Sequence, residues 1–588
     1  MVASQSVVGR ANAEKAHGIV GLLKNPFVFL TCCFASLGCI MYGYDQGVMG
    51  PILVMENFQN HFPTFTGSTI QGWLVSALEL GAWAGALING ILADRISRKY
   101  AMMSAVLIFT LGTGLQAGAQ TPAYFFAGRV IGGVGIGMFS MVIPLYQAEI
   151  APPELRGSLV SLQQLSITIG TAISFWLDYG MQYVGGTTCN PEGISNPYLT
   201  DGTYNAALTH GHTCLGQKTI AWRLPLALQI IPAWILFFGM FWFPFSPRWL
   251  MMKHRDEDAL ASLSKLRRLP ATNPLVRAEF LEIKAAVMFD EETESEAIGA
   301  GGTLAPWKAL FAPNMLKRLF LGCGTMICQQ FTGINAVLYY APQIFASFGF
   351  SSTKQTLLAT GVTGILQIIF TLPAVLFLDK FGRKTFLIVG AIGMFLCHIV
   401  VATVEGIYKP KWDLNQGLDK GQGWVAIVFI WLFAVNFAYS WGMHGPLFNL
   451  SYFLANLPIL GPVAWVLTQE IFPNSQRSKG VAIVASTNWL FNFIIGLTTK
   501  DMLNSMKYGT YIFFAIFSGL GGLFIWWFAP ETKDKTLEEL DVFFGGSEAS
   551  IAEADRQRMQ RINESLGLAG VENVEDLKVA VTSEQVEM

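Results

Sequence analysis

The stretch DRISRK, residues 94–99, follows an apolar run, and a close copy, DKFGRK, follows another apolar run at residues 379–384. A second motif is repeated in the same way, as EIAPPELR at 149–156 and EIFPNSQR at 470–477. Basic residues alone would be ordinary decoration of cytoplasmic loops, but that alternative does not explain acids at matched offsets. The repeats therefore indicate internal duplication of a helical unit, as in two-bundle transporters.

Composition and hydropathy place this unit in a membrane. Hydrophobic residues make up 52% of the 588 residues and charged residues 13%, about half the charged fraction of a soluble protein. Runs long enough to cross a bilayer occur at 27–44, 73–92, 101–119, 126–146, 158–179, 224–243, 319–340, 357–378, 385–404, 424–441, 481–498 and 511–528. We predict an all-α membrane protein with twelve transmembrane helices in two pseudo-symmetric six-helix bundles.

Positive charge sets the expected orientation. Lys and Arg cluster after the second, fourth, sixth and eighth runs, and the positive-inside rule places those loops and both termini in the cytoplasm. The expected domains are a cytoplasmic tail at 1–25, a bundle at 26–243, a helical cytoplasmic linker at 244–316, a bundle at 317–529 and a cytoplasmic tail at 530–588. We expect a multi-pass protein of the plasma membrane, and the N-terminus lacks the apolar core of a cleavable signal peptide.

Two of the eight cysteines stand apart. Cys189 and Cys214 lie in the polar segment 181–221, on the expected outer side, whereas the others lie in apolar runs. The outer compartment permits disulfides, so we predict that these two cysteines are bonded. No Cys or His spacing suits a metal, and we expect no metal and no cofactor.

Several motifs resemble the sugar porter family of the major facilitator superfamily, in the style of fungal monosaccharide transporters. They are GYDQGVMG (43–50), GILADRISRK (90–99), GRVIGGVGIG (128–137), EIAPPELRG (149–157), PFSPRWL (244–250), QQFTGINAVLYYAP (329–342), LDKFGRK (378–384), GPVAWVLTQEIFP (461–473) and PETK (530–533). The resemblance covers about residues 26–541. It implies the major facilitator fold and transport of a hexose or pentose. The glycines of 128–137 follow an Arg inside a helix, so they indicate close helix packing rather than a dinucleotide loop.

A sugar needs amides that donate and accept hydrogen bonds, with aromatic faces for its C–H surfaces. By resemblance, the substrate contacts are Gln164, Gln329, Gln330, Asn335, Trp465 and Asn488, and Tyr339 and Tyr340 contribute to the outer gate. A single amide such as Gln163 is better explained by an interhelical hydrogen bond. Gln367 stands where the family often has Asn, which leaves the identity of the substrate open.

Asp45 raises a separate question, because a carboxylate at membrane depth costs several kcal/mol unless it is paired or hydrated. The resemblance pairs it with Arg129, as in proton-coupled members of the family. Pairing favours the ionised acid and separation favours the neutral acid, so conformational change can be coupled to proton uptake. The alternative is a static ion pair between the first and fourth spans.

Charged residues at the cytoplasmic ends of the spans suggest gates. We predict that ion pairs among them close the inner mouth when the bundles approach. The residues are Asp94, Arg98, Glu149, Arg156, Asp379, Arg383, Glu470 and Arg477.

These observations lead to a monosaccharide:proton symporter that works by alternating access. Its partners would be the sugar, protons and the lipid bilayer, with no nucleic acid. The alternatives are a passive sugar facilitator, a non-transporting sugar sensor, and a transporter of a sugar acid or quinate. The short segment after Pro530 argues against a sensor, since such family members carry long tails. No nucleophile–base set or phosphate-binding loop points to an enzyme, and His398, alone in its run, is interpreted as structural.

An apolar stretch at 443–461 does not fit this pattern. Deleting Met443 to Gly461 restores the family phrase Tyr-Ser-Trp-Gly-Pro-Val-Ala-Trp in frame. If the stretch crossed the membrane, Arg477 would move to the outside, against the charge rule. We predict that it is a retained intron in the gene model, and the alternative is a re-entrant or displaced helix.

Overall fold

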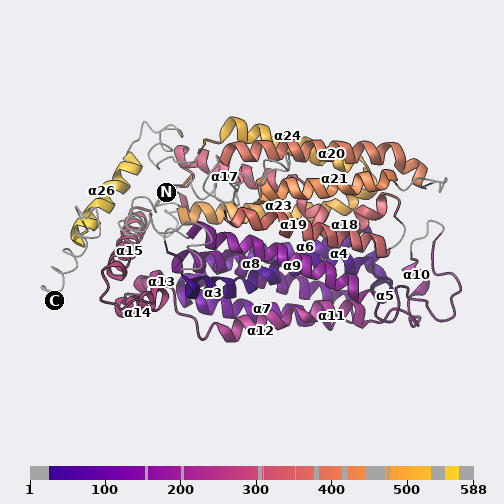
Figure 1. The fold of residues 1–588 in the computed structure, drawn as a ribbon, viewed down its shortest axis with the longest axis horizontal. Coiled ribbons are helices and arrows are strands. Elements are labelled where there is room, and N and C mark those ends of the chain that lie inside the picture. The colour runs from indigo at the N-terminus through magenta and orange to yellow at the C-terminus, as the bar shows by residue number, and fades with distance from the viewer. Residues whose placement is uncertain are drawn as a thin grey trace.

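The computed structural model describes residues 25–152, 156–199, 204–301, 307–308, 310–350, 353–376, 383–413, 421–443, 471–472, 477–531, 544 and 550–568. The regular elements in these ranges are helices, with two isolated β-bridges in the segment around 191–214. Long helices of the first half form one layer beside those of the second half (Figure 1). The predicted all-α class is confirmed.

The helices of the first half cover the first six predicted spans. They are α3 (Pro26–Ala35), α4 (Leu37–Leu53), α6 (Ser68–Ile96), α7 (Arg98–Ala117), α8 (Pro122–Ile150), α9 (Arg156–Met181), α11 (Ile220–Leu228) and α12 (Ile230–Gly239). The first span bends between α3 and α4, where the Ser36 hydroxyl donates to the Cys32 carbonyl at 2.8 Å. Such back-bonding from Ser often bends a helix.

The helices of the second half cover the other six spans. They are α17 (Pro313–Phe331), α18 (Ile334–Ser347), α19 (Thr353–Leu376), α20 (Arg383–Asp413), α21 (Gly421–Phe437) with the π-helical turn η4 (Ala438–Met443), α23 (Arg477–Ser505) and α24 (Gly509–Phe528). By length and composition, eight helices of the described ranges can cross a membrane. Helices thus occupy all twelve predicted spans.

Further helices lie at the two ends of the molecule (Figure 1). At one end, here called the linker end, lie α13 (Pro247–Met252), α14 (Asp256–Arg267), α15 (Pro274–Gly301) and α26 (Ser550–Ser565). At the other, called the disulfide end, lie α5 (Glu56–His61), η2 (Pro63–Thr66) and α10 (Ala206–Thr209). The predicted linker is therefore helical.

Glycines allow the helices of the first half to approach closely. A Cβ atom at Gly133 or Gly137 of α8 would overlap the carbonyl oxygens of Leu78 and Ala82 on α6. Small residues at such crossings are typical of helix packing in membranes. The result is that α8 lies directly against the backbone of α6, which determines the surroundings of Arg129.

The outer faces of the helices are apolar. Leu111, Trp242 and Trp527 are 58%, 73% and 72% exposed. Water would make so many exposed apolar side chains costly, whereas lipid tails do not. The exposed surface of the long helices is therefore suited to a bilayer.

Candidate functional site

The seventh span is broken between α17 and α18, and this break positions polar side chains inside the protein. Gly333 adopts φ 89° there, a left-handed conformation that glycine accepts without steric cost. The carbonyl of Thr332 accepts a hydrogen bond from His398 Nε2 at 2.9 Å. On either side of the break, Asn335 Nδ2 donates to Gln330 Oε1 at 2.6 Å. His398 thus has a structural contact, and the break brings two predicted substrate contacts together.

Gln329 connects three helical segments beside this break. Its Nε2 donates to the Trp441 carbonyl of η4 at 2.8 Å, and its Oε1 accepts from Asn488 Nδ2 of α23 at 2.8 Å. Gln329, Gln330, Asn335 and Asn488 are all at most 7% exposed. Four of the six predicted substrate contacts are therefore buried and form two hydrogen-bonded pairs from adjacent positions of α17, here called the amide cluster. Gln164 is half-buried on α9 in the other half, and Trp465 lies outside the described residues.

Asp45 and Arg129 form a buried ion pair in the first half. Arg129 Nη1 lies 3.1 Å from Asp45 Oδ1, and the two side chains are 2% and 1% exposed. The remaining N–H groups of Arg129 bind the backbone, with Nη2 donating to the Val75 carbonyl at 3.1 Å and Nε to the Leu74 carbonyl at 3.3 Å. These bonds depend on the close approach of α8 to α6. Arg129 is thus held in place independently of Asp45.

The sequence analysis missed Glu79, a fully buried acid on α6. Glu79 Oε1 lies 2.5 Å from the Tyr339 hydroxyl of α18, and Oε2 accepts from Asn492 Nδ2 of α23 at 2.8 Å. Tyr339 Oη is also 3.1 Å from Gln46 Nε2. The signal was present in SALELGAW, a lone Glu inside the apolar run 73–92. Such an intramembrane acid is by default a functional candidate.

The described gate residues meet inside the first half. Arg98 of α7 contacts Asp94 of α6 at 2.8 Å and Glu149 of α8 at 2.8 Å. One guanidinium group therefore connects the ends of these three helices. Trp249 of α13 donates to the Asp94 carbonyl at 3.1 Å, which joins the linker to the same cluster. These described pairs therefore do not bridge the two halves, because the ends of three neighbouring helices converge there. Closure of the linker-end mouth by such pairs stays a prediction. The positions Asp379 and Glu470, and the side chains of Arg156, Arg383 and Arg477, lie outside the described residues.

Comparisons with known proteins identify the family. A family profile described as "Sugar (and other) transporter" matches residues 31–448 and 447–544. The chain belongs to the sugar porter family. The two matched stretches meet at 447–448, inside the anomalous segment 443–461.

The relatives of this sugar porter are named for different substrates. An MFS glucose transporter of Aspergillus flavus is 32% identical over 557 residues, which are 92% of this chain and 94% of that one. A quinate permease of Emericella nidulans is 32% identical over 575 residues, 95% of this chain and 96% of that one. The relatives therefore agree on the family and differ in the named substrate, which is a sugar or quinate.

Solved structures show the fold of the porter. The xylose transporter XylE of E. coli, in a partially occluded inward-open conformation, is 27% identical with a TM-score of 0.64, covering 87% of this chain and 100% of that one. XylE described as a proton:xylose symporter, bound to 6-bromo-6-deoxy-D-glucose, is 28% identical with a TM-score of 0.64, covering 88% and 99%. The porter thus has the major facilitator fold and is a multi-pass membrane transporter.

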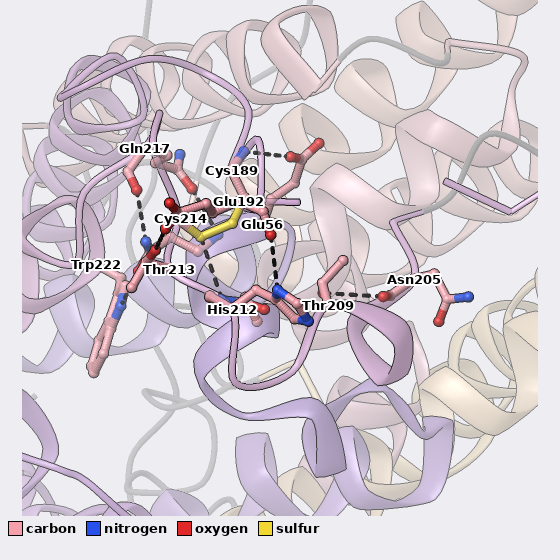
Figure 2. Close-up of a disulfide and its surroundings, with 12 residues drawn as sticks. Glu56, Cys189, Glu192, Asn205, Thr209, His212, Thr213, Cys214, Gln217 and Trp222 are labelled. Carbon is pink, nitrogen blue, oxygen red and sulfur yellow. Dashed lines mark hydrogen bonds between the residues drawn. A yellow bond between two sulfur atoms is a disulfide. The ribbon is translucent and has the colours of Figure 1, made fainter. Parts of the chain in front are cut away.

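The loop at the disulfide end forms an ordered cap on the porter. Figure 2 shows the bond between Cys189 and Cys214, whose Cα atoms are 4.8 Å apart. Glu56 of α5 accepts from the Cys189 N–H at 2.7 Å and from the Tyr198 hydroxyl at 3.1 Å. Burial raises the pKa of Glu56 despite these two hydrogen bonds, and burial together with Glu56 raises the pKa of Tyr198 to about 12. The cap is thus attached to α5 through the half-buried carboxyl group of Glu56.

Described contacts between the two halves of the porter lie at the disulfide end and also midway along α6, where Trp83 Nε1 donates to Ser486 Oγ of α23 at 2.7 Å. Ser68 Oγ donates to Asp501 at 2.5 Å, and one turn further along α6 the Gly72 backbone lies against the Leu497 carbonyl of α23. A further contact between the halves joins α9 and α19, where the Trp176 ring packs on Gly361. The structure therefore shows the porter with its halves in contact at that end.

Proposed function

We propose that this porter moves a neutral monosaccharide across the membrane by alternating access. The amide cluster of Gln329, Gln330, Asn335 and Asn488 carries the proposal, because amides both donate to and accept from sugar hydroxyl groups. In the described structure these amides bond to one another and to the backbone. A sugar that binds between the amide cluster and the first half can replace those hydrogen bonds with hydrogen bonds to its own hydroxyl groups.

Charge favours a neutral substrate over quinate. A carboxylate substrate is best held by a guanidinium or ammonium group, and Arg129 of this region already binds Asp45 and two backbone carbonyls. The four side chains of the amide cluster are themselves uncharged, so they offer a carboxylate no opposite charge. These observations support a sugar as the substrate.

Proton coupling is proposed to pass through Asp45 and Arg129. The pair is neutral as a unit while it is closed, and a conformational change that separates it leaves a buried carboxylate that gains from binding a proton. Because backbone carbonyls hold Arg129, movement of α4 is the change that would separate the two. XylE, which is a proton:xylose symporter, is consistent with this route.

The orientation follows from the basic residues. Lys and Arg of the linker end would place it in the cytoplasm, with the disulfide cap outside, where oxidation is possible. The proposed domains are the two bundles 26–243 and 317–529, the linker 244–316, and cytoplasmic tails at 1–25 and 530–588. A position in the plasma membrane belongs to the same proposal.

The decisive test is uptake of labelled glucose, xylose and quinate by cells that lack their own hexose transporters and express the chain. Accumulation of a neutral sugar that a protonophore abolishes supports the symporter. Sugar equilibration without accumulation would instead support a passive facilitator. Uptake of quinate alone would refute the sugar assignment, and binding without any uptake would identify a sensor.

A further inference from the structure

A hydrogen-bonded ring joins the two halves of the porter through Glu79, Tyr339 and Asn492. Glu79 comes from α6 in the first half, and its two partners come from α18 and α23 in the second. Tyr339 Oη lies 2.5 Å from Glu79 Oε1 and 3.2 Å from Asn492 Oδ1, and Asn492 Nδ2 lies 2.8 Å from Glu79 Oε2. All three side chains are at most 1% exposed. Water is therefore excluded from the ring, and its polar atoms depend on each other.

The number of hydrogens in the ring depends on the charge of Glu79. The Tyr339 hydroxyl has one hydrogen, although it faces two acceptors, Glu79 Oε1 and Asn492 Oδ1. If Glu79 is ionised, that hydrogen goes to Glu79 and Asn492 Oδ1 receives none within the ring. If Glu79 is neutral, it donates to Tyr339 Oη, which donates to Asn492 Oδ1, and Asn492 Nδ2 donates back to Glu79 Oε2. Each ring contact then has one donor and one acceptor, which is the arrangement that buried polar groups require.

The surrounding charges lead to the same conclusion. Arg129 of α8 and Asp45 of α4 lie near Glu79 and carry opposite charges. Tyr42 of α4 also lies near Glu79, and Gln46 of α4 donates to Tyr339 Oη in the ring. Arg129 is already neutralised by Asp45. An ionised Glu79 would leave this buried group with a net negative charge, whereas a neutral Glu79 leaves it neutral. Uncompensated charge in a membrane interior is costly.

Opening of the disulfide end would break the ring. Alternating access requires α6 to separate from α18 and α23 at that end, and Glu79 would then lose both partners and meet water. A hydrated carboxyl group at neutral pH releases its proton. Closure would take up one proton from the disulfide side, and opening would return it to the same side.

We propose that Glu79 is a second proton-binding site, separate from Asp45, in which one proton holds the two halves together at the disulfide end. The proton adds to the Glu79 carboxylate as the halves close and leaves it to water as they open, so it is not transported. This inference goes beyond the proposed function, because it needs the opening of the gate and no particular substrate.

The test measures the distance between the two halves as a function of pH. Leu208 on α10 and Met506 after α23, which are 53% and 46% exposed, are each replaced by cysteine. The two cysteines carry spin labels, and the purified full chain is placed in lipid nanodiscs. The chain without these two cysteines gives the background from native thiols. We expect the short distance between the two spin labels, which reports the closed disulfide end, to dominate at pH 5. The fraction of molecules with a longer distance should increase towards pH 8. A distance distribution that ignores pH would overturn the proposal.

Variants assign the response to one acid. Glu79→Gln imitates the neutral acid, since its amide can donate to Tyr339 and accept from Asn492, and should keep the short distance at every pH. Asp501→Asn is the matched control, because Asp501 is the other acid between α6 and α23, and it should keep the pH response. If Glu79→Gln still opens with pH, or Asp501→Asn abolishes the response, the proton lies elsewhere.

A second variant covers the case in which Glu79→Gln does not fold. Tyr339→Phe removes the hydroxyl group to which the neutral acid donates. The pH at which half of the molecules are open should therefore fall by about one unit, which corresponds to the free energy of one hydrogen bond. An unchanged midpoint in Tyr339→Phe would contradict the proposed ring. These experiments do not measure sugar uptake. Their outcome therefore does not depend on whether the proposed substrate is correct.

Discussion

Arg129 is bound to Asp45 on one side and to the backbone of α6 on the other. Its Nη1 lies 3.1 Å from Asp45 Oδ1, while Nη2 and Nε donate to the carbonyls of Val75 and Leu74. Asp45 Oδ2 makes no hydrogen bond to the residues that the structure describes. The arginine therefore has backbone contacts to keep it in place when the acid leaves, whereas the acid faces the arginine and the Gln229 side chain.

Asp45→Asn tests whether this asymmetry serves proton coupling. Asparagine cannot change its charge, so accumulation of sugar against a gradient should be lost while exchange across the membrane persists. Labelled-sugar uptake and counterflow in the same vesicles measure the two activities. Concentrative uptake at the wild-type level in Asp45→Asn would show that the pair is a static structural contact.

Asn335→Ala tests the amide cluster. Loss of one hydrogen bond to the substrate costs about 0.5–1.5 kcal/mol, so the KM should rise roughly 2- to 10-fold, and Gln330→Ala should behave alike. Gln116→Ala is a matched control, because Gln116 binds the Gly128 carbonyl within the first half. Its surface abundance should fall without a change in KM. Wild-type affinity for every transported sugar in both cluster variants would exclude these residues as contacts.

Glu56→Gln tests the half-buried carboxyl group that holds the cap. Burial raises the pKa of Glu56 above its ordinary value of 4.5, so the native state holds the proton more tightly than the unfolded state. The stabilisation from this group is therefore fully present below pH 4.5 and is lost as the pH rises through the native pKa. Glutamine can accept from Cys189 and donate to Tyr198 without titrating, so Tm of Glu56→Gln should lack that decline.

The matched control for the cap is Glu192→Gln, which alters an exposed acid of the same loop. Thermal unfolding between pH 4 and pH 8 should show the wild-type decline in this variant. A parallel decline in Glu56→Gln would mean that another group causes the pH dependence.

Removal of residues 443–461 tests the origin of that segment. The segment begins two residues after Trp441, whose carbonyl holds Gln329 in the amide cluster. Without it, Gly442 would continue directly into Pro462, and Trp465 would follow on the same span. We expect the shortened chain to be more abundant at the membrane and to transport faster. Mature messenger RNA that always contains codons 443–461, together with efficient transport by the full chain, would refute the intron interpretation.

Local features of the sequence were sufficient for the class, the positions of the spans and the family. Apolar runs and basic loops act through the bilayer, which each segment meets separately, so they can be recognised one at a time. The glycines at 128–137 could be interpreted in the same way, since close packing of helices depends on small residues at single positions.

Only the tertiary structure decided which polar groups meet. Glu79 is one acid in an apolar run, and its role depends on Tyr339 and Asn492, which are 260 and 413 residues later. Arg98 finds both of its acids within one half, although the repeat suggested gates between halves. A buried hydrogen bond or ion pair is set by distance and direction across helices, and those depend on the packing of the whole bundle rather than on the residues beside it in the chain.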